Sequence, residues 1–346
     1  MMELKEVLQK FCMCGAPSGA ESEIYSAAAQ VMEPFGNCKT DKRGNFICTK
    51  VGNGTHYLLD AHMDQIGLVV TAIEENGFLK VDKVGGMDRR ILPSLEVVVL
   101  GREPVYGVIS CKPPHLSDES EKNKAAKFED ICIDTGLSGA ALKEKVSLGD
   151  KVVLKPYFGE MLGGNVTGTA IDDRAGMAIL ARTVELLAKN NASATITAVF
   201  SVGEEVGGKG AGNASFYTEA DEAIAVDVSF ASQPEVSGAH KNATMPLGGG
   251  AFIGTAPILS KQMTDDFIAV AKQENIPYRI EVMGGRTGTN ADEIASVGYG
   301  TKTITVSPPI RNMHTGVEVV HLDDLEQCAK LIAAYILSKE GKACVI

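Results

Sequence analysis

The sequence predicts an α/β protein in which a mostly parallel sheet covered by helices carries a small inserted β unit. After residue 165, strand-like runs alternate with amphipathic helical runs, which is typical of parallel sheets covered by helices. Between residues 65 and 164, short β-like runs with frequent Gly and Pro follow one another, which predicts a small β-barrel or β-sandwich. We therefore expect a discontinuous larger domain of residues 1–64 and 165–346, interrupted by a β domain of residues 65–164.

The bulk composition fits a soluble globular protein. The 346 residues are 45% hydrophobic and 22% charged, enough apolar material for a sizeable core and a second unit. A net charge of -11 without a clustered basic surface argues against a nucleic-acid partner. The N-terminus does not resemble a signal peptide, and no apolar run approaches the ~18 residues that span a bilayer. Eight cysteines without C-x-x-C spacing indicate free thiols, so we expect a cytoplasmic protein with no membrane partner.

The N-terminal segment, roughly residues 3–33, has a helical pattern that is broken at Gly15-Ala16-Pro17. The sequence then restarts with Ser18 and Glu21 at the spacing of a capping box, in which both side chains satisfy free amides of a new helix. We expect a helix pair that packs against the sheet.

Two strands are predicted next, at 45–50 and 57–61, and the Gly52-Asn53-Gly54 sequence between them is a strong hairpin signal. The inserted unit contributes further short strands, and the segment after residue 165 contributes the alternating elements. The clearest of these are strands at 95–100, 106–109, 151–154, 195–200, 223–226 and 301–306, and helices at 174–190, 208–219, about 263–271 and about 325–335.

Ionisable residues gather where these strands end. Ligands of open α/β sheets bind beyond the carboxyl ends of the strands, so these residues are expected on one edge. Like charges repel in a cleft of low dielectric unless cations compensate them. A mixed set of imidazoles and carboxylates suits two divalent ions, zinc or cobalt foremost and manganese as a possibility. The residues are His62, Asp64, Asp172, Asp173, Glu204, Glu205, Asp227 and His314.

Each of these residues also has an ordinary structural interpretation. Asp172-Asp173 precedes a helix, where both residues are explained equally well as N-terminal caps. Glu204-Glu205 is also explained as a solvated strand end, although the glycines at 203, 207 and 208 favour a tight backbone around a site. Asp64 is suited to accept the second imidazole N–H of His62 and fix its tautomer. The other histidines are interpreted as structural: His56, His115, His240 and His321.

Five strings of residues, in order along nearly the whole chain, resemble the M42 family of metallo-aminopeptidases. That family includes glutamyl and deblocking aminopeptidases and the large tetrahedral peptidases, and some relatives are labelled endoglucanases. One such motif would be weak, whereas five at the right spacing are specific. The strings are Asp60-Ala61-His62-Met63-Asp64-Gln65-Ile66-Gly67, Ala170-Ile171-Asp172-Asp173-Arg174-Ala175-Gly176, Gly203-Glu204-Glu205-Val206-Gly207, Ala225-Val226-Asp227-Val228 and Arg311-Asn312-Met313-His314-Thr315.

Carried over position by position, the resemblance implies a role for each site residue. Asp172 would bridge two metals, with His62 and Asp227 completing one site. Glu205 and His314 would complete the other. Glu204 would be the general base that takes a proton from a metal-bound water, which leaves a metal-bridging hydroxide, and Asp64 would assist catalysis by orienting His62.

The resemblance also implies substrates and an assembly. Short peptides with a free N-terminus would be the substrates, and the inserted 65–164 segment would be a dimerisation domain whose dimers build a dodecamer. The chain departs from the usual family pattern at Gln65, Asn290 and Asn312, three positions expected near the substrate pocket. A glycoside hydrolase and a non-catalytic scaffold remain as alternatives, although the absence of Trp weakens the first.

Overall fold

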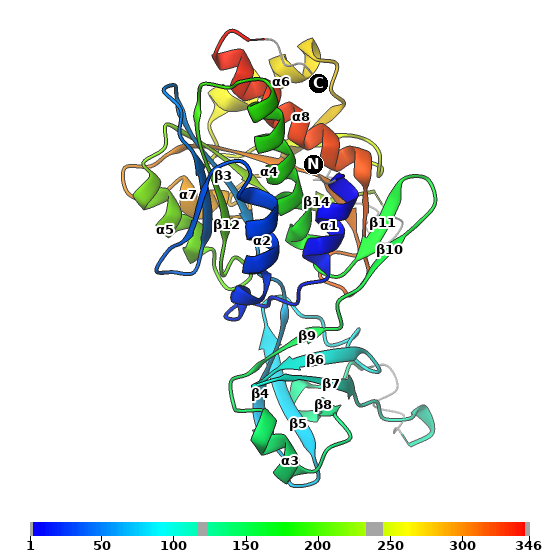
Figure 1. Cartoon of the computed structure of the whole chain (residues 1–346). Coiled ribbons are helices and arrows are strands. Elements are labelled where there is room, and N and C mark those ends of the chain that lie inside the picture. Colours follow the sequence, from blue (N-terminus) through cyan, green and yellow to red (C-terminus); the bar gives the residue numbers. More distant parts are fainter. Residues whose placement is uncertain (1–2, 117–123, 233–244, 343–346) are drawn as a thin grey trace.

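A computed structural model of the chain describes residues 3–116, 124–232 and 245–342. Figure 1 shows a larger α/β part with a smaller β-barrel projecting from one end. The barrel strands run between residues 67 and 154, so the α/β part is built from chain segments on both sides of them.

An eight-stranded sheet forms the centre of the α/β part, in the order β1-β2-β12-β3-β13-β17-β15-β16. The four strands from β12 to β17 are mutually parallel, whereas β1 and β2 at one side are antiparallel to their neighbours. The predicted parallel sheet is therefore confirmed for its middle, within a mixed sheet. The strands are β1 (Asn37–Thr40), β2 (Phe46–Lys50), β3 (His56–His62), β12 (Thr195–Ser201), β13 (Glu222–Val226), β15 (Ala251–Thr255), β16 (Tyr278–Val282) and β17 (Lys302–Ser307).

The hairpin predicted at Gly52-Asn53-Gly54 is wrong. β12 lies between β2 and β3, pairing antiparallel with the first and parallel with the second. The turn at 52–54 instead wraps around the start of β12, because the amides of Asn53 and Gly54 both donate to the Ser193 carbonyl, at 2.9 and 3.0 Å. A local turn sequence was thus outweighed by the burial gained when a central strand is inserted.

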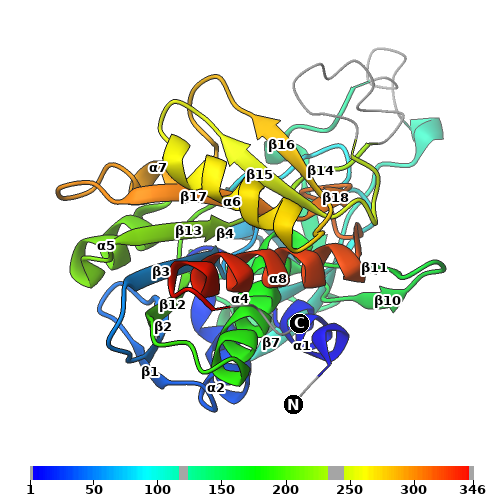
Figure 2. The same cartoon turned by 90° about the horizontal axis from the view of Figure 1, so that it is seen from above.

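Helices cover both faces of this sheet, as Figure 2 shows from above. Alternating side chains of β3 separate the two faces: Leu59 packs into the core with α4 and α8, whereas Leu58 packs into the core with α5 and α7. The helices are α1 (Leu4–Cys12), α2 (Tyr25–Met32), α4 (Ile171–Lys189), α6 (Lys261–Gln273) and α8 (Leu322–Lys339), with α5 (Lys209–Thr218) and α7 (Ala291–Ile294) on the opposite side.

The N-terminal helical segment is interrupted as predicted, but the capping box at Ser18 and Glu21 is absent. The hydroxyl of Ser18 donates to Asp64 Oδ2 at 2.6 Å, and the short helix η1 (Glu21–Ile24) begins after Ala20 without a side-chain cap. Ser18 therefore serves a long-range contact rather than the local one that its spacing indicates.

A second sheet of five strands, in the order β10-β11-β19-β18-β14, lies beside the first and was not predicted. His314 belongs to the turn between its antiparallel strands β18 and β19, rather than directly following β17. The strands are β10 (Phe158–Glu160), β11 (Asn165–Gly168), β14 (Ser229–Phe230), β18 (Pro309–Arg311) and β19 (Glu318–His321).

The inserted unit is a closed barrel in the order β4-β5-β8-β7-β6-β9, which decides between the two predicted β architectures. Its interior is filled by aliphatic side chains and one methionine, and strand β7 alternates strictly between exposed and buried residues. The strands are β4 (Gly67–Ile73), β5 (Phe78–Val84), β6 (Glu96–Leu100), β7 (Pro104–Ile109), β8 (Cys132–Asp134) and β9 (Lys151–Leu154), joined by α3 (Gly139–Lys145), η2 (Pro114–Leu116) and η3 (Phe128–Asp130). Within the described residues, no helix has the length and apolar character needed to cross a membrane.

Candidate active site

The parallel strands bring the predicted site residues to one edge of the main sheet. β3 ends at His62, which lies opposite Ser201 at the end of β12. Ala225 of β13 pairs with Asp60 of β3, so Asp227 follows β13 at the same level. Because these strands run in the same direction, the residues that follow them meet beyond their carboxyl ends. The arrangement confirms the topological argument made from the strand pattern.

Asp172 lies between the two histidines. Its Oδ1 is 3.0 Å from His62 Nε2, and its Oδ2 is 3.3 Å from His314 Nε2. A second carboxylate lies near each imidazole: Glu205 Oε1 is 3.4 Å from His314 Nε2, and Asp227 Oδ1 is 3.9 Å from His62 Nε2. One carboxylate thus faces two imidazoles, each with a carboxylate of its own.

Two groups of side chains have ligand atoms close enough together to hold a metal ion. The first contains His62, Asp172 and Glu205, and the second contains His62, Asp173 and Asp227. Asp173 is therefore a possible metal ligand as well as a helix cap. Its Oδ1 accepts the Gly176 N–H at 2.9 Å, while its buried Oδ2 lacks a hydrogen-bond partner among the described residues.

Electrostatics mark the cluster as acidic and desolvated. Burial raises the pKa of Glu205 to about 8, and burial also raises the pKa values of Glu204 and Asp227. Burial would raise the pKa of Asp172 as well, but its contacts with the two histidines hold that pKa below its usual range. The hydrogen bond to Asp172 in turn raises the pKa of His314 to about 9. Divalent cations would stabilise the charged carboxylates that burial disfavours.

The carboxylate of Asp64 binds backbone amides of the cluster, and its carbonyl oxygen, rather than the carboxylate, is the nearer partner of the His62 imidazole. The nearer acceptor for His62 Nδ1 is the Asp64 carbonyl oxygen at 3.0 Å, while the Asp64 carboxylate is 3.5 Å away. That carboxylate accepts the amides of Glu204 at 3.0 Å and Glu205 at 3.2 Å. With Nδ1 donating to the carbonyl, Nε2 is free to bind a metal, which is the tautomer expected from the sequence but fixed by a different atom.

Glu318 was missed by the sequence analysis. It is buried on β19, where its Oε1 accepts the His314 N–H at 2.7 Å and its Oε2 accepts the Asp172 N–H at 3.0 Å. One carboxylate therefore sets the spacing of two proposed ligands whose positions in the chain are 142 residues apart, the difference between 314 and 172. No local pattern around Glu318 predicts this role, because both partners are backbone amides and one of them, that of Asp172, lies 146 residues away.

Two glycines from the barrel side fit against the cluster. A Cβ placed on Gly86 would lie 2.6 Å from His314 Nδ1, and one on Gly85, which has φ +73°, would lie 3.2 Å from the Glu205 Cβ. Any larger residue at Gly86 would displace the imidazole. The barrel connection thus forms one wall of the site.

The three departures from the family pattern do not line the main cleft themselves but lie close to it, since Thr289 and Met313 line it and Gln65 lines a small hollow shared with Asp172, Glu205 and His314. Gln65 accepts the Ala16 N–H at 3.1 Å and contacts the buried guanidinium of Arg174. Asn290 donates at 2.8 Å to Asp60, a buried acid whose pKa desolvation raises to about 7. Asn312 contacts the Val317 carbonyl at 3.4 Å. Their partners are backbone groups or buried side chains that are not among the proposed metal ligands.

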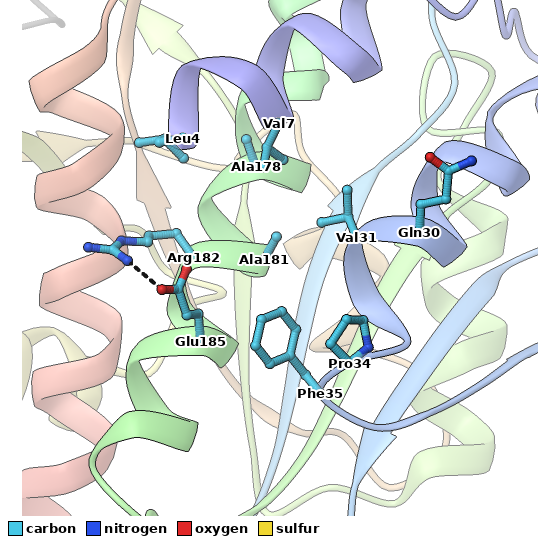
Figure 3. Close-up of a pocket in the computed structure, with 10 residues that line it drawn as sticks. All are labelled: Leu4, Val7, Gln30, Val31, Pro34, Phe35, Ala178, Ala181, Arg182 and Glu185. Atoms are coloured by element: carbon cyan, nitrogen blue, oxygen red, sulfur yellow. Dashed lines mark ion pairs between the residues drawn. The ribbon is translucent and has the colours of Figure 1, made fainter. Parts of the chain in front are cut away.

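A cleft of about 270 Å³ opens over the cluster. Its walls include the proposed ligands, the proposed base Glu204 and residues from β14, β16 and β17. A separate hollow of about 180 Å³ lies among α1, α2 and α4 (Figure 3), but its lining is mainly apolar and its charged pair, Arg182 and Glu185, is joined at 2.9 Å. The chemistry therefore belongs to the first cleft.

The other histidines have structural positions where they are described. His56 Nε2 is 2.9 Å from the Thr197 hydroxyl, and His321 caps α8 by accepting the Asp323 N–H at 3.1 Å. His115 lies in η2, and His240 lies outside the described residues.

The donor set fits divalent cations. Two imidazole Nε2 atoms and three or more carboxylates converge, which is the mixed nitrogen and oxygen shell that zinc and cobalt accept. The carboxylates outnumber the imidazoles, so cations would relieve the repulsion within the cluster.

Known proteins resemble the chain over most of its length. The family model described as M42 glutamyl aminopeptidase matches residues 44–331. A lysyl aminopeptidase from Pyrococcus furiosus is 31% identical over 304 residues, which are 86% of each chain. Among solved structures, a TET aminopeptidase from a marine-sediment Thaumarchaeota archaeon superposes with a TM-score of 0.89 at 28% identity, covering 96% of both chains. The TET1 peptidase of Pyrococcus horikoshii, described as assembling into a tetrahedron or a large octahedral shell, superposes with a TM-score of 0.84 at 33% identity, covering 96% of this chain and 98% of that one. The chain therefore belongs to the M42 peptidase family.

Proposed function

We propose that this chain is a two-metal aminopeptidase that removes residues from the N-termini of short peptides. The observation that carries the proposal is Asp172, whose two carboxylate oxygens face the Nε2 atoms of His62 and His314 from opposite sides. In this proposal Asp172 bridges two ions, His62 and Asp227 complete one site, and Glu205 and His314 complete the other. Zinc or cobalt is the expected metal, and manganese suits the same ligands less closely.

When bound, the cations supply an acidified water and polarise the scissile carbonyl. Residues of the chain would carry out the proton transfers and hold the metal ligands in position. Glu204 lines the cleft, and its backbone is fixed by Asp64, so its carboxylate is placed to accept a proton and return it to the leaving amine. The neighbouring Glu205 points to His314 instead, which separates the base from the ligand.

Recognition of a free N-terminus follows from the acidity of the cleft. A protonated α-amine would be attracted to a site lined by carboxylates, whereas a blocked terminus has no charge to offer. We further propose a homo-oligomer in which the barrel mediates dimerisation, and the shell formed by the TET1 peptidase supports this by analogy. A cytoplasmic location belongs to the same proposal. The glycoside hydrolase alternative is not favoured, because it gives the two histidines no task.

The adjacent glutamates provide a matched test. Aminoacyl-nitroanilides are assayed after chelation and after zinc, cobalt or manganese is added back, with Glu204→Gln and Glu205→Gln compared throughout. Glu204→Gln should keep metal binding and lose about 10²- to 10⁴-fold in kcat, the usual contribution of general acid–base catalysis. Glu205→Gln should lose metal affinity first. Near-normal turnover in Glu204→Gln, or full activity without metal, contradicts the proposal; sugar release after complete chelation would support a glycosidase.

A further inference from the structure

Strand β16 has an inverted burial pattern. Ile280 and Val282 are 42% and 60% exposed, whereas Glu281 between them is only 8% exposed. Apolar side chains normally take the buried positions of a strand, and burying a carboxylate costs free energy unless it is paired. This strand is arranged to present an acid to the interior, where the acid lines the cleft over the proposed metal site.

Glu281 has little to neutralise it. The Ser229 hydroxyl donates a hydrogen bond to Oε1, but none of the described residues that line the cleft is a lysine or arginine. Burial raises the pKa of Glu281 despite the hydrogen bond from Ser229, in keeping with the absence of a cationic side chain from this lining. Glu281 is also outside both groups of possible metal ligands, so a cation held by either group would not be coordinated by the Glu281 carboxylate.

We propose that Glu281 is the specificity-determining residue of the cleft and selects peptides whose N-terminal side chain is cationic, lysine or arginine. The inference rests on the proposed aminopeptidase function and names its substrate class. A lysine or arginine side chain that enters the cleft brings the charge that Glu281 lacks, and a charge-assisted hydrogen bond forms away from bulk water. An acidic N-terminal residue is repelled by the same carboxylate.

A purely structural explanation exists and makes a different prediction. Among the described strands, β16 pairs only with β15 and forms an edge of the main sheet. Inward-pointing charges protect sheet edges from pairing with other chains. If Glu281 had only this role, its removal would lower solubility or the melting temperature and would leave the relative rates on different substrates unchanged.

The test compares two proteins on two substrates. Metal-reconstituted wild type and Glu281→Gln are assayed on lysyl-nitroanilide and norleucyl-nitroanilide, which differ by the terminal ammonium group. Glu185→Gln is the matched control, because Glu185 is buried to a similar degree, 7% exposed, but lies outside the cleft. Wild type should favour the lysyl substrate in kcat/KM by about 10- to 100-fold, the range for a hydrogen bond to a charged group, and Glu281→Gln should abolish most of this ratio while keeping its rate on the norleucyl substrate.

Equal wild-type kcat/KM values for the two substrates overturn the inference, and this comparison needs no variant to fold. An equal loss on both substrates in Glu281→Gln, or a changed melting temperature with an unchanged lysyl-to-norleucyl ratio, also overturns it. If wild type cleaves neither these nor other aminoacyl-nitroanilides with any of the metals, the proposed function itself fails and the inference fails with it.

Discussion

The barrel and the α/β part bury different kinds of side chain. Among the described residues between 66 and 168, no polar or charged side chain is buried, and the barrel core consists of Val, Leu, Ile and Met. Around the ends of β3, β12 and β13, by contrast, the buried side chains include five residues of the candidate site, His62, Asp64, Asp172, Asp173 and Asp227. The side chains in the barrel core thus stabilise it by apolar burial.

This difference indicates where stability and function are coupled. A buried carboxylate cluster is costly without compensating cations, so the α/β part would gain stability from the proposed metal ions, whereas the barrel would not. The two parts meet at Gly85 and Gly86, which approach Glu205 and His314. We therefore expect a change in the stability of one part to leave the other part unaffected, except at this junction.

The largest expected effect is that of metal removal. Binding at about 1,000 times Kd stabilises the folded state by about 4 kcal/mol, so chelation should lower the melting temperature clearly. Hydrogen exchange should then increase in the segments that carry His62, Asp172, Glu205 and Asp227, with little change in the barrel strands. An equal increase throughout the barrel would contradict the separation of the two parts.

A truncation in the barrel core tests whether a loss of barrel stability leaves the site unaffected. Leu79→Ala removes a side chain that is fully buried in the barrel and should cost about 2–5 kcal/mol in the free energy of unfolding, measured by denaturant titration. The kcat/KM of the folded fraction and its metal affinity should stay at wild-type values. Loss of metal affinity in proportion to the loss of stability would show that the site depends on the barrel core.

Glu318→Gln tests the positioning of the ligands. The amide group of glutamine can accept only one of the two N–H groups that Glu318 holds, so His314 and Asp172 should lose their fixed spacing. Outer-shell changes commonly weaken metal affinity by about 10- to 100-fold, which a chelator competition would measure. Glu222→Gln, which alters a hydrogen bond to Tyr335 away from the site, is the control and should bind metal normally. Unchanged affinity in Glu318→Gln would remove its positioning role.

The smallest effect concerns acid stability of the α/β part. Burial opposes ionisation of Glu340, but Lys342 and the amides of Ser193 and Ala194 outweigh it and lower the pKa of Glu340 to about 2. Since the folded state favours the carboxylate, its contribution is present above pH 4.5 and is lost as the pH falls toward 2.

Glu340→Gln should therefore lose about 1 kcal/mol at pH 7, and the difference from wild type should disappear near pH 2. Unfolding curves of both proteins at several pH values measure this difference. A difference that stays constant with pH would show that the charge of Glu340 contributes nothing.

The class of the fold and the members of the candidate site could be predicted from sequence patterns. His62 ends a strand and Glu205 and Asp227 follow strands, and parallel strands place their carboxyl ends on one edge, so local patterns were sufficient to group them. The barrel was also predictable, because its short strands and turns are encoded within one continuous segment.

The pairing of distant segments could not be predicted from local patterns. The insertion of β12 between β2 and β3 overrode a strong hairpin signal, and Ser18 donates to Asp64 instead of capping its own helix. Glu318 accepts an amide 146 residues away, and Glu281 accepts a hydroxyl 52 residues away. Hydrogen bonds of this range leave no periodic or local trace in the sequence, because they depend on which elements pack together.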